Sequence, residues 1–287
     1  MLTETFHSIT GATRNVLGNW KSMLLIGAVY ASLLAVLYLF VSIKEATLAQ
    51  VTLTFVFAVA VPLLFFVLQA MIASGHPGFV GPRPAVPLAA AASPAFVLKR
   101  SLASFWKLIV ITLPLIALAV LIAYLLSKAQ NRFGANLTDL ANSTHRLEEV
   151  VNRTKPAPRP IDWRTALFST LRYLCFGLVL PLAAIHLWLA TVRDGLGAAI
   201  RRLATVLARA FSPQSVLIYI VGFLIFAVAP YFLLFRTTQT KHAWLELSLL
   251  VVRLIVVYAL TLFGWTITVR ALAAAPRAEA REAEARP

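Results

Sequence analysis

Acidic residues are the scarcest chemical class in this sequence. The 287 residues include only 11 Asp and Glu against 26 Lys and Arg, which gives a formal net charge of +15. Charged residues of both signs make up 13% of the chain, whereas a soluble globular domain has about 25%. Disordered chains, collagen-like rods and coiled coils are more polar or more periodic than this sequence. The composition therefore excludes these classes.

Cysteine and catalytic motifs are also scarce. Cys175 is the only cysteine, which excludes an intrachain disulfide and leaves the redox compartment open. The sequence has no His-Glu-x-x-His pair, no Gly-x-Ser-x-Gly turn and no phosphate-binding loop, and its five histidines are scattered singly. Membrane enzymes and proton-coupled transporters need ionisable groups at depth, yet no Asp or Glu lies inside a hydrophobic run. We therefore expect no enzyme, no metal and no cofactor.

Long hydrophobic runs dominate what is present. Hydrophobic residues make up 60% of the chain, and the mean hydropathy is +0.82. About 20 apolar residues cross a bilayer core as a helix, and the runs are continuous rather than alternating, which favours helices over barrel strands. The predicted fold is an all-α integral membrane bundle of six transmembrane helices. The expected spans are 22–43, 50–74, 108–126, 166–192, 216–235 and 247–269.

The basic residues predict an orientation. They concentrate before the first span, between spans two and three, between spans four and five, and after span six. The short loops on the other side hold only Lys44, Arg236 and Lys241. Because cytoplasmic loops are rich in Lys and Arg, we expect both termini in the cytoplasm. We predict one transmembrane domain over 1–275 with an external loop at 128–163, followed by a flexible cytoplasmic tail, 276–287.

An internal repeat of three units is predicted. Amphipathic segments precede the odd-numbered spans, with starts near residues 5, 94 and 196. The clearest runs over 196–211 and ends at Ser212-Pro213, a typical helix start. We expect three interfacial amphipathic helices, each followed by a transmembrane hairpin.

This pattern resembles the repeated membrane domains of bacterial uncharacterised polytopic families. One such domain is attached to certain glycerophosphodiester phosphodiesterases. The resemblance covers the hydrophobic body and implies a bacterial cytoplasmic membrane. Catalytic residues of that enzyme class are not carried over, because the chain has no matching soluble domain.

Two arginines inside or beside spans are candidate binding residues. Only 16 residues separate Arg253 from Arg270, about 24 Å of helix, so Arg253 is expected to reach the outer interface by snorkelling. The alternative is that Arg253 and Arg172 flank a site for a phosphate or carboxylate headgroup. We treat Arg253 as the one intramembrane charge.

Other polar residues are candidates for lipid contact or helix contact. The basic residues of the amphipathic segments can touch anionic lipid; these are Lys99, Arg100, Arg201 and Arg202. His186 and Gln69 lie within spans, and each is expected to hydrogen-bond a neighbouring helix rather than to handle protons or bind a ligand.

These features predict a non-enzymatic polytopic membrane protein. The first hypothesis is a structural or accessory subunit that binds anionic lipid and a partner protein or a second copy, and no nucleic acid. The alternative is a small transporter or lipid-translocating protein that uses the outer arginines and the proline-containing helices.

Overall fold

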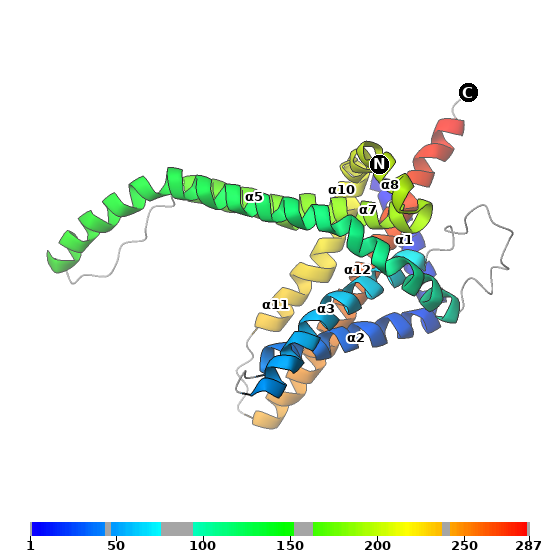
Figure 1. The fold of residues 1–287 in the computed structure, drawn as a ribbon, viewed down its shortest axis with the longest axis horizontal. Helices are drawn as coiled ribbons and strands as arrows, with labels where there is room; N and C mark the ends of the chain where they lie inside the picture. Colours follow the sequence, from blue (N-terminus) through cyan, green and yellow to red (C-terminus); the bar gives the residue numbers. More distant parts are fainter. Residues whose placement is uncertain (1, 44–46, 76–93, 152–162, 237–241, 286–287) are drawn as a thin grey trace. The chain divides into compact units, whose positions relative to one another are not determined.

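The structure is a computed structural model that describes residues 2–43, 47–75, 94–151, 163–236 and 242–285 (Figure 1). All regular elements in these residues are helical. The chain divides into two compact units, residues 1–111 with 185–287 and residues 112–184, and each is described by itself. In chain order the elements are α1 (Leu2–Gly18), α2 (Trp20–Ser42), α3 (Leu48–Ser74), α5 (Pro94–Val151), α6 (Trp163–Leu174), η2 (Cys175–Val179), α7 (Leu180–Asp194), α8 (Leu196–Arg201), α9 (Leu203–Ala210), α10 (Pro213–Phe223), η3 (Leu224–Val228), α11 (Ala229–Phe235) and α12 (Ala243–Ala285).

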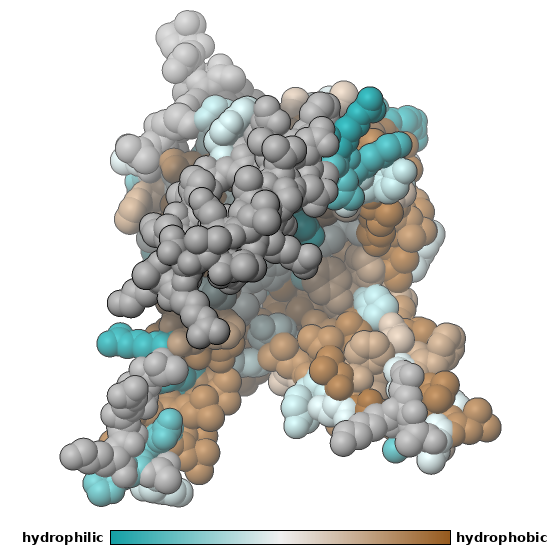
Figure 2. Space-filling view, turned by 90° about the vertical axis from the view of Figure 1, so that its left-hand side faces the viewer, coloured by the Kyte–Doolittle hydropathy of each residue, from teal (hydrophilic) through white to brown (hydrophobic). Residues whose placement is uncertain are grey.

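Six helical stretches are long and apolar enough to cross a membrane, which confirms the six predicted spans. Large hydrophobic side chains lie exposed along them, for example Phe55 at 70%, Phe232 at 68% and Ile255 at 62%. Hydrophobic residues cover most of the surface that Figure 2 colours. Such contiguous apolar surface is incompatible with water but suits lipid, so the chain is a polytopic membrane protein. The six stretches are Trp20–Ser42, Leu48–Ser74, Ala95–Arg132, Ala166–Asp194, Pro213–Phe235 and Trp244–Ala275.

Helix α12 is the centre of the larger unit. It packs against α1, α3, α10, η3 and α11, and α2 packs along α3 (Figure 1). Gly264 permits the close approach of α12 and η3, because an added Cβ would lie 2.9 Å from Cβ of Phe226. Two interhelical hydrogen bonds add to this packing: Tyr258 donates to the Gly27 carbonyl at 2.6 Å, and Trp265 donates to Gln69 at 3.0 Å. Small residues and such hydrogen bonds are what holds membrane helices together.

Two π-helical turns each precede a proline. Turn η2 ends two residues before Pro181, and η3 ends two residues before Pro230. A proline inside a helix clashes with the carbonyl four residues earlier and removes one hydrogen bond; a wider turn relieves this clash. Pro62 and Pro114 lie inside α3 and α5 without such a turn.

The amphipathic segments are helical, but they do not form three equivalent elements. Segment 196–211 forms two short helices, α8 and α9, and Ser212 caps α10 with Pro213 in its first turn, as predicted. Before the first span, α1 is separate from α2. Before the third span there is no break, because α5 starts at Pro94 and continues to Val151. The threefold repeat of elbow and hairpin is therefore not confirmed.

Helix α5 also changes the expected external loop. Its 58 residues correspond to about 87 Å of helix, almost three times a bilayer core. Residues 128–151 of the expected loop are thus a continuation of the third span. The remaining loop residues, 152–162, lie outside the described part of the chain. Helix α12 continues to Ala285, so most of the segment predicted as a flexible tail is helical; its mobility stays a prediction.

Candidate anion-binding site

A tight turn at the end of α7 builds the candidate site. Gly195 has a φ of +87° and a ψ of 163°, a region that is open almost only to glycine, and its N–H donates to the Thr191 carbonyl at 3.0 Å. Helix α8 follows, and the chain bends again at Arg202 before α9. The two bends bring α9 beside the last turns of α7, where both helices border one pocket.

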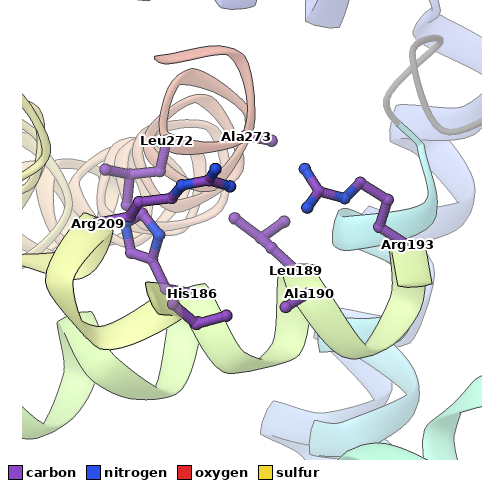
Figure 3. Close-up of a pocket in the computed structure, with 8 residues that line it drawn as sticks. His186, Leu189, Ala190, Arg193, Arg209, Leu272 and Ala273 are labelled. Carbon is purple, nitrogen blue, oxygen red and sulfur yellow. The ribbon is translucent and has the colours of Figure 1, made fainter. Parts of the chain in front are cut away.

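Two guanidinium groups point into this pocket from different helices. Arg193 reaches in from α7 and Arg209 from α9, and they face each other across it (Figure 3). The cavity measures about 40 Å³, room for a few water molecules or one small anionic group. Its remaining wall is almost wholly apolar; this wall is formed by Leu189, Ala190, Val206, Leu272 and Ala273, with His186 at one side.

Arg193 is held in place by its neighbour in the sequence. Its Nε and Nη2 donate to the two carboxylate oxygens of Asp194 at 2.9 and 2.8 Å. Such a two-point pair fixes the guanidinium plane. Arg202 and Arg209 also lie within electrostatic range of Asp194. The two guanidinium groups that line the pocket and the Asp194 carboxylate thus carry one net positive charge, and Arg202 adds a further positive charge nearby.

His186 lies deeper than the arginines. It is 6% exposed, and its buried Nε2 has no hydrogen-bond partner among the described residues. Nε2 therefore does not make the predicted hydrogen bond to a neighbouring helix. An imidazole nitrogen can donate or accept a hydrogen bond, but Nε2 of His186 is buried, so only the residue as a whole borders the pocket. Guanidinium groups on an apolar floor are suited to bind a phosphate or carboxylate group.

The predicted basic residues are not among the described residues that line the pocket. Arg201 is exposed on α8, where its Nε donates to the Gly197 carbonyl at 3.3 Å. Arg202 is exposed at the bend between α8 and α9. Lys99 is exposed and Arg100 half-buried on the first turns of α5.

The two arginines of the expected outer pair lie in different compact units, and each is described by itself. Arg253 donates from Nη1 to the carbonyl of Arg236, the C-terminal cap of α11, which is a common way to satisfy the end of a helix. Arg172 is exposed on α6, in the other compact unit. A shared anion site of Arg253 and Arg172 stays a prediction. Gln69, 4% exposed, accepts the bond from Trp265 and so joins α3 to α12.

Sequence reasoning missed the two arginines that converge. From the sequence, Arg193 and Arg209 contributed only to the predicted orientation of the chain in the membrane. They lie 16 positions apart on separate helices, and only the bends at Gly195 and Arg202 bring them together. The signal that could have found them is Gly195 directly after Arg193-Asp194, since a glycine at a helix end permits a sharp reversal.

A second cation is buried away from this pocket. Arg270 was expected beyond the sixth span, yet it is 1% exposed, and its three guanidinium nitrogens have no hydrogen-bond partner in the part of the chain that the structure describes. A Cβ added at Gly75 would lie 2.5 Å from its Nη2. The guanidinium therefore lies against the C-terminal end of α3, where the helix dipole is negative.

No protein-family model, curated protein or solved structure matches this chain. Within the described residues, no group of three or more His, Cys, Asp or Glu side chains could hold a metal ion.

Proposed function

We propose that this chain is a non-enzymatic membrane protein that binds one anionic phospholipid by its phosphate at the pocket of Arg193 and Arg209. The observation that carries the proposal is the convergence of these two guanidinium groups on one small cavity. Two like charges repel, and Asp194 offsets only one of them, so an anion between the two guanidinium groups would favour their shared orientation.

The charge and the walls of the pocket both favour a phosphodiester. The two arginines and Asp194 carry one net positive charge and Arg202 adds another nearby, which favours the negative charge of a phosphodiester group over a neutral group. The apolar wall of Leu189, Ala190 and Leu272 would adjoin the glycerol and chain region of a lipid. The pocket also lies at the end of a helix that is long and apolar enough to span a membrane. The ends of such helices lie at the level of the lipid headgroups.

The proposed role is structural or accessory. We infer that bound lipid fixes α7, α9 and α12 together, and that both termini face the cytoplasm of a bacterium, where anionic headgroups attract basic segments. A partner protein or a second copy of the chain is part of this proposal, and the resemblance to the repeated bacterial membrane families supports the location.

Thermal unfolding in a mild detergent tests the proposal. Phosphatidylglycerol should raise the melting temperature by a few degrees, since a ligand at about ten times its Kd adds about 1.4 kcal/mol. Phosphatidylcholine should raise it less. Inorganic phosphate at the same concentration separates a lipid headgroup from free phosphate: stabilisation by phosphate alone would assign the pocket to a soluble anion.

Matched arginine variants locate the effect. Arg209→Gln should weaken phosphatidylglycerol binding about fivefold, because one guanidinium near a membrane surface contributes about 1 kcal/mol. Arg201→Gln removes an equally exposed arginine from the adjacent helix and should leave the affinity within about twofold. Equal losses in the two variants would show that only diffuse surface charge attracts the lipid.

A further inference from the structure

A second, larger cavity lies between α1, α10 and α12. It measures about 290 Å³ and opens to the surface of the larger unit. Helices α10 and α12 form most of the wall, and Ile9 and Thr13 of α1 close one side. The other lining residues are Ile218, Val221, Gly222, Ile225, Ala259, Leu260, Phe263, Gly264, Ile267 and Thr268.

The lining of this cavity is apolar and suits a hydrocarbon ligand. Its two hydroxyl groups donate within their own helices, Thr13 to the Ile9 carbonyl at 2.9 Å and Thr268 to the Gly264 carbonyl at 2.6 Å. None of the described residues that line the cavity is charged. A cavity of about 150 Å³ holds one benzene ring, so this one has room for about a dozen carbon atoms. A flexible acyl chain fits this size and composition.

The cavity and the phosphate-binding pocket follow one another along α12. Leu260, Gly264 and Thr268 line the cavity, and Leu272 lines the pocket. Thr268 and Leu272 are four residues apart and therefore lie on the same side of the helix, one turn from each other. Thr268 and Leu272 are about 6 Å apart along the helix axis. On the other side, α9 contributes Arg209 to the pocket and leads directly into α10, which contributes Ile218 to the cavity.

We infer that this cavity holds an acyl chain of the same phospholipid whose phosphate lies between Arg193 and Arg209. The inference rests on the proposed function and adds a second point of attachment to it. The headgroup pocket then selects the charge of the lipid, and the cavity determines whether a lipid is retained at all.

Native mass spectrometry of the full chain, purified in mild detergent, separates these two roles. The probes are phosphatidylglycerol and phosphatidylcholine with identical chains, offered in equal amounts. Ala259→Phe places a ring in the cavity without touching the pocket. Ala58→Phe is the matched control, because Ala58 is an exposed alanine on α3 outside the cavity. Arg209→Gln alters the pocket alone.

The inference predicts that the cavity variant and the pocket variant change different properties of lipid binding. Ala259→Phe should lose at least fivefold in total bound lipid of both kinds, whereas Ala58→Phe should bind as the wild type does. Arg209→Gln should retain lipid in the cavity but lose the preference for phosphatidylglycerol. Undiminished binding by Ala259→Phe, together with an effect of Arg209→Gln, would overturn the acyl-chain site and leave the proposed function standing. If the wild type binds both lipids equally and Ala259→Phe abolishes this binding, the acyl-chain site stands and the proposed function is overturned.

Photolabelling of the wild-type chain covers the case in which Ala259→Phe does not fold. One equivalent of phosphatidylglycerol that carries a diazirine in the middle of its acyl chain is added, activated and located by peptide mass spectrometry. The expected label falls on the cavity segments of α10 and α12, around Ile218 and Leu260. Label distributed evenly over the exposed faces of α2 and α3 would contradict the inference.

Discussion

Arg270 shows how a single residue can work against the stability of the fold. Burial of an unpaired charge costs several kcal/mol, and the negative end of the α3 dipole returns at most about 2 kcal/mol. Arg193 differs, because the bidentate contact with Asp194 and its partial exposure satisfy its charge. The two arginines lie on different elements of the same unit, yet only one of them is positioned to meet a ligand.

Arg270→Met tests this cost. An apolar side chain of similar length removes the buried charge, so the variant should unfold at a higher temperature, with a gain of about 1–2 kcal/mol in the free energy of unfolding. Arg201→Met, at an exposed position, should change stability by less than about 0.5 kcal/mol. A loss of more than about 1 kcal/mol in Arg270→Met would show that the guanidinium makes a stabilising contact.

Gly195 is the second residue on which the site depends. Gly195→Ala places a Cβ on a backbone conformation that L-residues rarely adopt, which should cost about 1–3 kcal/mol and weaken phosphatidylglycerol binding by displacing α9. Gly197→Ala is the control, since its nearest neighbour would be Arg201 at 3.9 Å and helix propensity should raise stability slightly. Thermal unfolding and lipid binding measure both effects; an unchanged Gly195→Ala protein would contradict the role of the turn.

At the scale of elements, α12 organises the larger unit because small residues let its neighbours approach. Gly264 meets Phe226 of η3, and Gly222 of α10 meets Thr268. In a membrane, where burial of apolar surface gives no driving force, such close packing is a main source of helix association.

Gly264→Ala should therefore separate α12 from η3. The added Cβ would lie 3.2 Å from the backbone Cα of Phe226, which cannot rotate away, so a loss of about 1–3 kcal/mol is expected. Gly11→Ala on α1 has no atom within 4 Å of the new Cβ and should gain about 0.5–1 kcal/mol. Chemical denaturation in detergent compares the two; a stable Gly264→Ala protein would show that the interface tolerates extra volume.

The elements could be predicted from the sequence because a transmembrane helix is encoded locally. The six apolar runs and the Ser212-Pro213 start were sufficient to locate them. The site was not predicted, because Arg193 and Arg209 meet through two bends, of which Gly195 marks only the first. The break expected before the third span is absent, since nothing in 94–132 except Pro114 opposes one continuous helix, and a helix tolerates that proline.

At the scale of the whole molecule, six spans would place both termini on one side of the membrane. From the distribution of Lys and Arg we expect that side to be the cytoplasm. The same side would then carry the pocket of Arg193 and Arg209 and face anionic headgroups.

Reporter fusions test this topology. A fluorescent protein fused after Pro287 should fold and emit in the cytoplasm, and alkaline phosphatase at the same point should be inactive. Fusions after Arg236, at the end of the fifth span, should behave in the opposite way. Active phosphatase at the C-terminus would contradict the predicted orientation.

The lipid that accompanies the purified chain tests the central claim most directly. Phospholipids retained after purification in mild detergent, with none added, are identified and counted by mass spectrometry for the wild type and for an Arg193→Gln/Arg209→Gln double variant. We predict about one anionic phospholipid per wild-type chain, enriched over the surrounding membrane, and the loss of this anionic enrichment from the double variant. Retained lipid that matches the bulk composition, or that is unchanged in the double variant, would contradict a phosphate site between these arginines.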